Sequence, residues 1–241
     1  MAWLISREEW LKIYGLIVER IPWLSFQRDQ EATDLLSHIL VNHPRAVLFE
    51  DIKSKIKSSV SGIVVGCGGS LLRETGFLKT IDKTRFLIVA ADGATRVLLE
   101  NGVVPDLIVT DLDGDIEAIR KASRMGSITI IHAHGDNIDL LEKHVPLIEG
   151  FVSGSTQVEP RPYVYNYGGF TDGDRALFIL YHLGVREVYL AGFDLEEPGV
   201  CPGKTRIDLK SKIKKLEIAR LIMKYLEEKG VVFKHIGELH E

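Results

Sequence analysis

The residues with the strongest chemical signal are aspartates crowded into residues 90–115, within one predicted strand, helix and strand. They are Asp92, Asp106, Asp111, Asp113 and Asp115. The runs FLIVAAD and DLIVTDLD are apolar and β-branched until their carboxyl ends, where each becomes acidic, as buried parallel strands do at the edge that binds ligands. We therefore expect Asp92, Asp111 and Asp113 to converge on one crevice, whereas Asp106 and Asp115 are equally explained as a turn residue and a helix cap. The crevice suits a magnesium–nucleotide complex, because Mg²⁺ combines a few carboxylates with water and phosphate oxygens.

A glycine-rich turn, GCGGSLL at residues 66–72, follows the first β-rich run. Gly66, Gly68 and Gly69 allow a tight turn and leave backbone N–H groups free at the start of a predicted helix, where they can hold a phosphate. The turn is an incomplete dinucleotide fingerprint, because Leu71 stands where a third glycine is needed. Glycines that serve only the geometry of the turn are the alternative.

A second candidate loop, GVCPGKT at residues 199–205, comes close to a Walker A loop. It has one residue too few between its glycines, and Pro202 lacks an N–H for a phosphate, so we reject that interpretation. Lys204 and Arg206 remain as cations that can approach a phosphate chain if the loop folds over the crevice. A solvated loop without a role explains them equally well.

Two further segments carry polar residues at predicted strand or helix ends. In IHAHGDN, His132 and His134 point to the same side of a strand end. A metal pair is one interpretation, but no third nitrogen or sulfur ligand stands at a recognisable spacing, which favours substrate hydrogen bonding or packing. In GGFTDGDRAL a helix begins beside Thr171, Asp172 and Arg175, a combination that can bind metal and phosphate together. Helix capping accounts for Thr171 or Asp172 but leaves Arg175 unexplained.

The elements that must position these residues follow from hydrophobic periodicity. Residues 1–60 are predicted to form a helical N-terminal appendage, and Ser6 with Glu9 has the spacing of a capping box. Residues 61–241 alternate short β-rich runs with helical segments, which predicts one α/β domain with a largely parallel sheet and helices on both faces. The β-rich runs are GIVVG, RFLIVAA, DLIVTD, SITIIHAH, FVSGST, YVYNYG, EVYLAGF and VVFKHIG. A last helix over residues 209–229 is expected to bury Ile213, Leu216, Ile218, Leu221, Ile222 and Tyr225.

Composition excludes several classes of protein. With 241 residues and a net charge of −4, the chain shows no general attraction to nucleic acid or acidic membranes. Cys67 and Cys201 are far apart and neither lies in a CxxC pair, so we predict neither a zinc site nor a disulfide framework, and a reducing cytoplasm fits best. The amphipathic, charged N-terminus predicts neither a signal peptide nor a membrane span. The oligomeric state is left open, with a homo-oligomer among the alternatives.

The order of motifs resembles that of known enzymes. ADGAT, GVVPDLIVTDLDGD, Thr156-Gln157 and FTDGDRAL, within residues 62–194, resemble the catalytic domain of thiamine pyrophosphokinase, with departures at Ala94, Thr110, Gly114 and Arg175. No run of strands after Asp194 matches that enzyme's thiamine-binding sandwich. With its helical N-terminus, GCGGSL, HAHGDN, GFD and the late Lys215-Leu216 helix, the whole chain resembles the archaeal 6-hydroxymethyl-7,8-dihydropterin diphosphokinases.

The resemblance implies transfer of diphosphate from ATP to the pterin hydroxymethyl group, with release of AMP, in a folate or methanopterin pathway. It implies that Mg²⁺ or its waters, and the catalytic step, depend on Asp92, Asp111, Asp113 and Asp172. For the nucleotide phosphates it implies Gly68, Gly69, Ser70, Arg175, Lys204 and Arg206. For the pterin our candidates are His134, Asp136, Asn137 and Thr171. The alternatives are a diphosphokinase acting on another alcohol and a nucleotide-binding protein without turnover.

Overall fold

The predicted β-rich runs form the strands of one sheet in a computed structural model of the chain, which describes residues 3–21, 24–56, 61–196, 199, 201 and 209–240. The strands are β1 (Ser61–Val65), β2 (Phe86–Ala91), β3 (Leu107–Thr110), β4 (Ile128–Ala133), β5 (Val152–Thr156), β6 (Val164–Tyr165), β7 (Glu187–Ala191) and β8 (Val232–His235). Within the described residues their order is β6-β5-β4-β3-β2-β1-β7-β8, and every neighbouring pair is parallel.

The strands are apolar because helices cover both faces of the sheet. Every residue of β1 to β6 is buried, as the unbroken apolar runs predict for strands of a parallel sheet. All carboxyl ends lie at one edge of the sheet, and the order of strands reverses between β1 and β7. Ligands of open parallel sheets bind outside such a reversal point. The fold therefore predicts a ligand site near the residues that follow β1 and β7.

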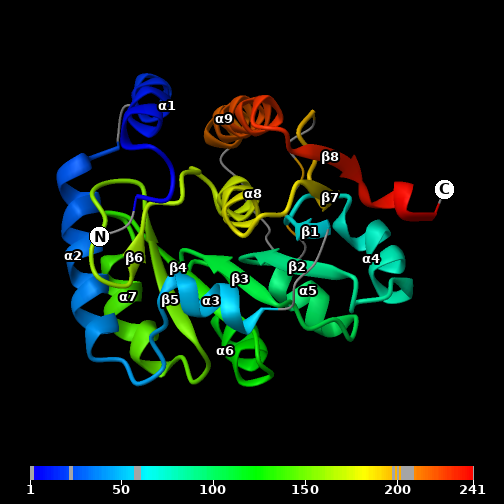
Figure 1. Ribbon diagram of the computed structural model, residues 1–241, viewed down its shortest axis with the longest axis horizontal. Helices are drawn as coiled ribbons and strands as arrows, with labels where there is room; N and C mark the ends of the chain where they lie inside the picture. Colours follow the sequence, from blue (N-terminus) through cyan, green and yellow to red (C-terminus); the bar gives the residue numbers. More distant parts are fainter. Residues whose placement is uncertain are drawn as a thin grey trace.

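The helices divide between the two faces (Figure 1). They are α1 (Arg7–Arg20), α2 (Phe26–Val41), α3 (Phe49–Lys55), α4 (Leu71–Thr80), α5 (Ala94–Glu100), α6 (Ile116–Arg124), α7 (Ile138–His144), α8 (Asp172–His182) and α9 (Leu209–Glu228), with 3-10 turns η1 (Val145–Leu147) and η2 (Ile236–His240). One face carries α1, α3, α8 and α9 in a single core cluster, and the other carries α2 and α4 to α7. The α/β class with a parallel sheet between helical layers is therefore confirmed.

The N-terminal helices are integrated with both layers. In α1, Ser6 caps the first turn by accepting from the N–H of Glu9, as its sequence predicts. The buried indole of Trp10 meets the ring of Phe178 in α8 edge-on, with centroids 6.5 Å apart, whereas α2 packs on β5 and α7 across the sheet. The division at residue 60 stays a prediction, because residues on both sides of it share these cores.

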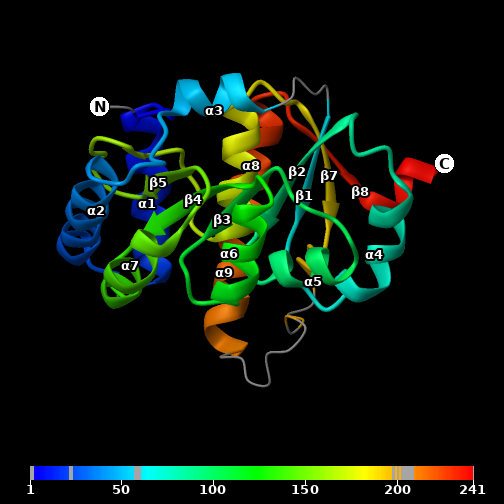
Figure 2. The same cartoon turned by 90° about the horizontal axis from the view of Figure 1, so that it is seen from below.

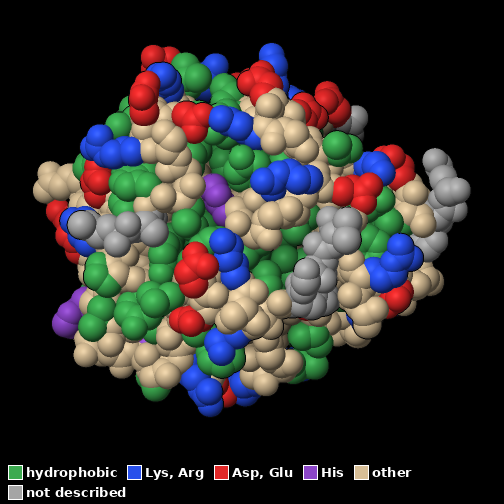
Figure 3. All heavy atoms as spheres, in the orientation of Figure 1, with side chains coloured by type: hydrophobic (Ala, Val, Ile, Leu, Met, Phe, Trp, Pro, Cys, Tyr) green, Lys and Arg blue, Asp and Glu red, His purple; other side chains and the backbone are tan. Residues whose placement is uncertain are grey.

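The last helix is confirmed, with one error in its predicted face. Ile218 and Ile222 are buried, but Ile213 is 42% exposed. In Figure 2 the first turns of α9 extend past the carboxyl end of β7, so this part of the helix does not rest on the sheet. No helix in the described part of the chain has the length and apolar character needed to cross a membrane. Acidic and basic side chains are interspersed on the face in Figure 3, which agrees with the modest net charge.

Candidate functional site

Three carboxylates meet at the carboxyl edge of the sheet. Asp92 follows β2, Asp111 follows β3, and Asp172 is the first residue of α8; one oxygen from each lies within 4.8 Å of the others. Because the ends of adjacent parallel strands and the start of α8 share this edge, residues 80 positions apart in sequence come together. Three hard oxygen ligands at this spacing are a donor set that suits Mg²⁺.

The backbone around Asp92 is shaped to hold its carboxylate in place. Asp92 itself has a φ of 37°, a conformation that costs free energy and persists only where the surroundings impose it. The hydroxyl of Thr110 donates to Asp92 Oδ1 (2.7 Å) and accepts from the N–H of Leu112 (2.8 Å). A Cβ on Gly114 would lie 2.2 Å from Asp92 Oδ2, so the glycine leaves the space that this carboxylate occupies.

The charges of the cluster are crowded. Burial raises the pKa of Asp172 well above its ordinary value, and the neighbouring carboxylates of Asp111 and Asp92 raise it further. Burial also acts to raise the pKa of Asp111, but His134, the backbone N–H of Asp113 and Lys215 outweigh it and lower that pKa to about 2. The surroundings thus disfavour the charged form of Asp172, which means that the cluster lacks positive charge. A bound dication would supply that charge.

Asp113, the fourth predicted metal residue, is not among the three clustered carboxylates. Its side chain is exposed, and its N–H donates to Asp111 Oδ1 at 3.2 Å. The role of Asp113 at the metal therefore stays a prediction. An exposed carboxylate outside the cluster would contact the ion best through a bridging water.

A cavity of about 430 Å³ opens beside the carboxylates, at the reversal point between β1 and β7. Its walls combine apolar side chains, including Phe193, Leu195 and Leu216, with the carboxylates of Asp92 and Asp172. This size and character are typical of small-molecule sites.

Two lysines that the sequence analysis did not select as site residues also line this cavity. Lys212 and Lys215 stand three residues apart on α9, so they share one face of the helix. Lys215 is close enough to Asp111 to lower its pKa. The other predicted cations of this region, Lys204 and Arg206, lie outside the described residues.

The glycine-rich turn before α4 is already hydrogen-bonded within the protein. The N–H of Gly68 donates to the carbonyl of Gly192 (2.9 Å), and the N–H of Ser70 donates to Asp194 Oδ2 (2.9 Å). Both acceptors belong to the segment after β7, which the sheet places beside the turn after β1. Phosphate binding by Gly68, Gly69 and Ser70 stays a prediction, and for Gly68 and Ser70 it would require these acceptors to be displaced.

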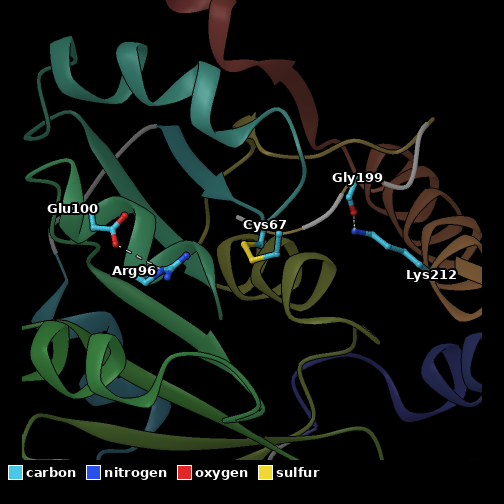
Figure 4. Close-up of a disulfide and its surroundings, with 6 residues drawn as sticks. Cys67, Arg96, Glu100, Gly199 and Lys212 are labelled. Carbon is cyan, nitrogen blue, oxygen red and sulfur yellow. Dashed lines mark hydrogen bonds and ion pairs between the residues drawn. A yellow bond between two sulfur atoms is a disulfide. The ribbon is translucent and has the colours of Figure 1, made fainter. Parts of the chain in front are cut away.

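The expectation that the two cysteines form no disulfide is wrong. Cys67 and Cys201 are joined, with Cα atoms 4.7 Å apart (Figure 4). They are 134 residues apart in sequence, but the pairing of β1 with β7 brings their loops together. The same segment is held from α9, where Lys212 Nζ donates to the carbonyl of Gly199.

The start of α8 is ordered by its own side chains. Thr171 caps the helix, and the buried Asp174 accepts from the N–H of Phe170 and from the N–H and hydroxyl of Thr171. The fully buried guanidinium of Arg175 donates to the carbonyls of Gly169 (2.9 Å) and Phe170 (3.0 Å). Arg175 therefore contributes positive charge near Asp172 from behind the helix terminus, and direct phosphate contact by Arg175 stays a prediction.

The HAHGDN loop lies next to the carboxylates, on the β4 side. His134 Nδ1 accepts from the N–H of Asp136 (3.3 Å), which leaves Nε2 to carry the proton that faces Asp111 Oδ2 at 3.5 Å. The buried amide of Asn137 donates to the carbonyls of Asp111 (2.8 Å) and His132 (2.7 Å) and fixes the end of β3 against the end of β4. Of the pterin candidates, Asp136 is exposed and His134 partly exposed, and contact of any of them with a substrate stays a prediction.

The N-terminal helix α2 supports the same loop, which the sequence did not indicate. The buried carboxylate of Asp29 accepts from the N–H of Gly135 (2.8 Å) and from Gln157 Nε2 (2.7 Å). Arg28 donates to the carbonyl of Gly135 (2.7 Å), and the Cβ of Arg28 lies only 2.5 Å from the position that a Cβ on residue 135 would take. Gln157 Oε1 is buried and accepts from no described group, so this part of the site has an acceptor to offer.

Comparison with known proteins gives consistent matches. A family model described as "6-hydroxymethylpterin diphosphokinase MptE-like" matches residues 37–199. Two proteins named 6-hydroxymethyl-7,8-dihydropterin pyrophosphokinase are similar over nearly the full length. That of Pyrococcus furiosus is 40% identical, over 92% of this chain and 95% of its own; that of Methanocaldococcus jannaschii is 35% identical, over 93% and 97%.

Among solved structures, the MAf glycosyltransferase of Magnetospirillum magneticum superposes with a TM-score of 0.54 at 20% identity, over 84% of this chain and 35% of that chain. That likeness concerns the fold alone. Thiamine pyrophosphokinase of Bacillus subtilis superposes over 72% of this chain and 59% of that one, at 17% identity and a TM-score of 0.38.

Proposed function

Because the chain belongs to the MptE-like 6-hydroxymethylpterin diphosphokinase family, we propose that it transfers a diphosphate from ATP to 6-hydroxymethyl-7,8-dihydropterin and releases AMP, with Mg²⁺ at the three clustered carboxylates. The product would enter a folate or methanopterin pathway. The observation that carries the proposal is the convergence of Asp92, Asp111 and Asp172, since their crowded charge calls for a dication where a phosphate chain must be held.

The proposed reaction is an in-line displacement. The hydroxymethyl oxygen of the pterin attacks the β-phosphorus, the bond from that phosphorus to the oxygen bridging to the α-phosphorus breaks, and AMP leaves with the bridging oxygen. A carboxylate of the cluster accepts the hydroxyl proton. Mg²⁺ held by Asp92, Asp111 and Asp172 would neutralise phosphate charge, and the protein's own contribution is to position the two substrates and to add basic side chains.

The two substrates are assigned to opposite sides of the carboxylates. We assign the nucleotide to the cavity between the β1 and β7 loops, because Lys212 and Lys215 line it and it lies at the reversal point of the sheet. We assign the pterin to the β4 and β5 side, where His134 and Gln157 offer hydrogen-bonding groups for a flat polar heterocycle. The attacking oxygen then approaches the phosphate chain from across the metal site.

The test is a product assay with ATP, Mg²⁺ and 6-hydroxymethyl-7,8-dihydropterin. We expect AMP and the pterin diphosphate in equal amounts, and no reaction with the 6-methyl analogue, which lacks the nucleophilic oxygen. Formation of ADP in place of AMP would refute diphosphate transfer, because ADP arises from attack at the γ-phosphorus. Binding of Mg-ATP without turnover on the pterin or any other alcohol would favour the nucleotide-binding protein without activity.

A further inference from the structure

The carboxylate of Asp194 occupies the position at the start of α4 where a bound anion would be expected. Its Oδ2 accepts from the N–H of Ser70 at 2.9 Å. The same oxygen lies 2.5 Å from where a Cβ of Gly68 would be, and 2.9 Å from where a Cβ of Gly199 would be. Only glycine at both positions leaves room for this carboxylate, so it is enclosed by backbone on two sides.

This placement changes what the glycine-rich turn can bind. A phosphate at the start of α4 would have to displace Asp194 or lie against its negative charge. The N–H of Gly68 is likewise already used, because it donates to the carbonyl of Gly192. The turn therefore presents a carboxylate to the cavity, and a carboxylate accepts hydrogen bonds from hydroxyl groups.

The cavity is lined by cationic and metal-binding residues as well as by Asp194. Asp194, which is hydrogen-bonded to the turn, lines the same cavity as Asp92 and Asp172 of the carboxylate cluster and as Lys215. Asp194 is partly exposed, and no group in the described part of the chain donates to its second oxygen, Oδ1. One acceptor is thus used to fix the side chain, and the other remains for a ligand.

We propose that Asp194 binds the ribose hydroxyls of the nucleotide, so that the phosphate chain runs from the ribose toward Asp172 and Lys215. This orientation rests on the proposed use of a nucleoside triphosphate. In other nucleotide sites at the carboxyl edge of parallel sheets, an acidic side chain accepts from the ribose hydroxyls. In those sites the acidic residue follows a strand other than the counterpart of β7. Phe193 and Leu216 line the same cavity, and their apolar side chains would then be available to cover the faces of the nucleobase.

The proposal assigns a selective role to Asp194 that helix capping alone does not give. A capping carboxylate stabilises α4 equally with any nucleotide present. A ribose acceptor distinguishes ATP from 2′,3′-dideoxy-ATP, because only ATP has the donors.

The test compares these two nucleotides in the wild type, in Asp194→Asn and in Asp51→Asn. The asparagine oxygen can still accept from Ser70, so Asp194→Asn keeps the cap and loses the charge. Asp51 is the matched control, since its carboxylate also accepts a backbone N–H, that of Leu48, but in the first turn of α3, and Asp51 does not line the cavity. The readouts are kcat/KM for each nucleotide, KM for the pterin, and Kd for each Mg-nucleotide by calorimetry.

We expect the wild type and Asp51→Asn to prefer ATP over the dideoxy compound about tenfold or more, in line with one or two lost hydrogen bonds. We expect Asp194→Asn to bind ATP about tenfold more weakly, with the preference falling toward one and the pterin KM unchanged. Equal losses for both nucleotides in Asp194→Asn, with the preference kept, would show a structural cap only and overturn the proposal, as would a wild type without preference. The Kd values alone decide whether Asp194 binds the ribose, because they are measured without the pterin. Failure of the proposed function would instead appear as the absence of pterin turnover.

Discussion

Gly114→Ala isolates the position of one carboxylate from the stability of the fold. The added Cβ would lie 2.2 Å from Asp92 Oδ2, whereas ordinary contact begins at 3.4 Å, so the carboxylate must move by about 1.2 Å. A misplacement of about 1 Å at a reacting centre costs on the order of a hundredfold in rate, or about 2.7 kcal/mol. We therefore expect kcat to fall about a hundredfold and the Mg²⁺ concentration for half-maximal activity to rise.

The free energy of unfolding should fall by no more than about one hydrogen bond. Gly114 has an ordinary φ, and the atom that must move is the end of a side chain rather than backbone. The largest expected loss is the Thr110 to Asp92 hydrogen bond, about 1.5–3 kcal/mol for a charged partner. Gly15→Ala is the control, because Gly15 lies exposed in α1 with nothing within 4 Å of its would-be Cβ.

The assay measures AMP formation at saturating ATP and pterin over a series of Mg²⁺ concentrations, together with thermal unfolding of both variants. Gly15→Ala should match the wild type in activity and gain slightly in stability. If Gly114→Ala retained wild-type turnover and Mg²⁺ dependence while folded, then the position of Asp92 would not limit the reaction, and its assignment as a metal ligand would be refuted.

The other predictions concern the metal and the disulfide. Asp111→Asn or Asp172→Asn should lower kcat about a hundredfold or more with the fold intact by circular dichroism, since each removes a charged ligand and no apolar packing; unchanged turnover in both would contradict the metal site. EDTA should abolish AMP formation and added Mg²⁺ should restore it, and activity that survives chelation would exclude a metal requirement. Cys67→Ser should lower the free energy of unfolding by about 2–5 kcal/mol, measured by denaturant titration without reductant, because the link closes a loop spanning 134 residues; equal stability with and without the link would refute it.

Part of the carboxylate cluster follows from local signals, although Asp113, which we expected beside Asp92 and Asp111, is not in it. Apolar runs that turn acidic at their carboxyl ends place Asp92 and Asp111 at one edge of a parallel sheet. A helix that starts after a strand places Asp172 at that same edge. Their convergence also depends on the pairing of β2 with β3, which brings the ends of these two strands together.

What the sequence could not supply depends on which strands are neighbours. Cys67 meets Cys201, and Ser70 meets Asp194, only because β1 pairs with β7. The periodicity identifies both strands but not their pairing, since parallel strands distant in sequence carry no local signal of register. The erroneous expectation for the cysteines has this cause.

Lys212 and Lys215 of α9 were not selected as site residues, although their spacing in the sequence carries a signal that could have identified them. Lys212, Lys215, Ala219, Ile222 and Leu226 are spaced three and four residues apart, so they form one stripe along the helix. The stripe is buried from Ala219 onward, where it packs in the core, and it becomes basic where α9 passes the edge of the sheet and lines the cavity. An apolar stripe that becomes basic in its first turns is the counterpart of an apolar strand that becomes acidic at its end, because both mark where an element passes from core to site. Together they give opposite charges facing one crevice, as a magnesium–phosphate substrate requires.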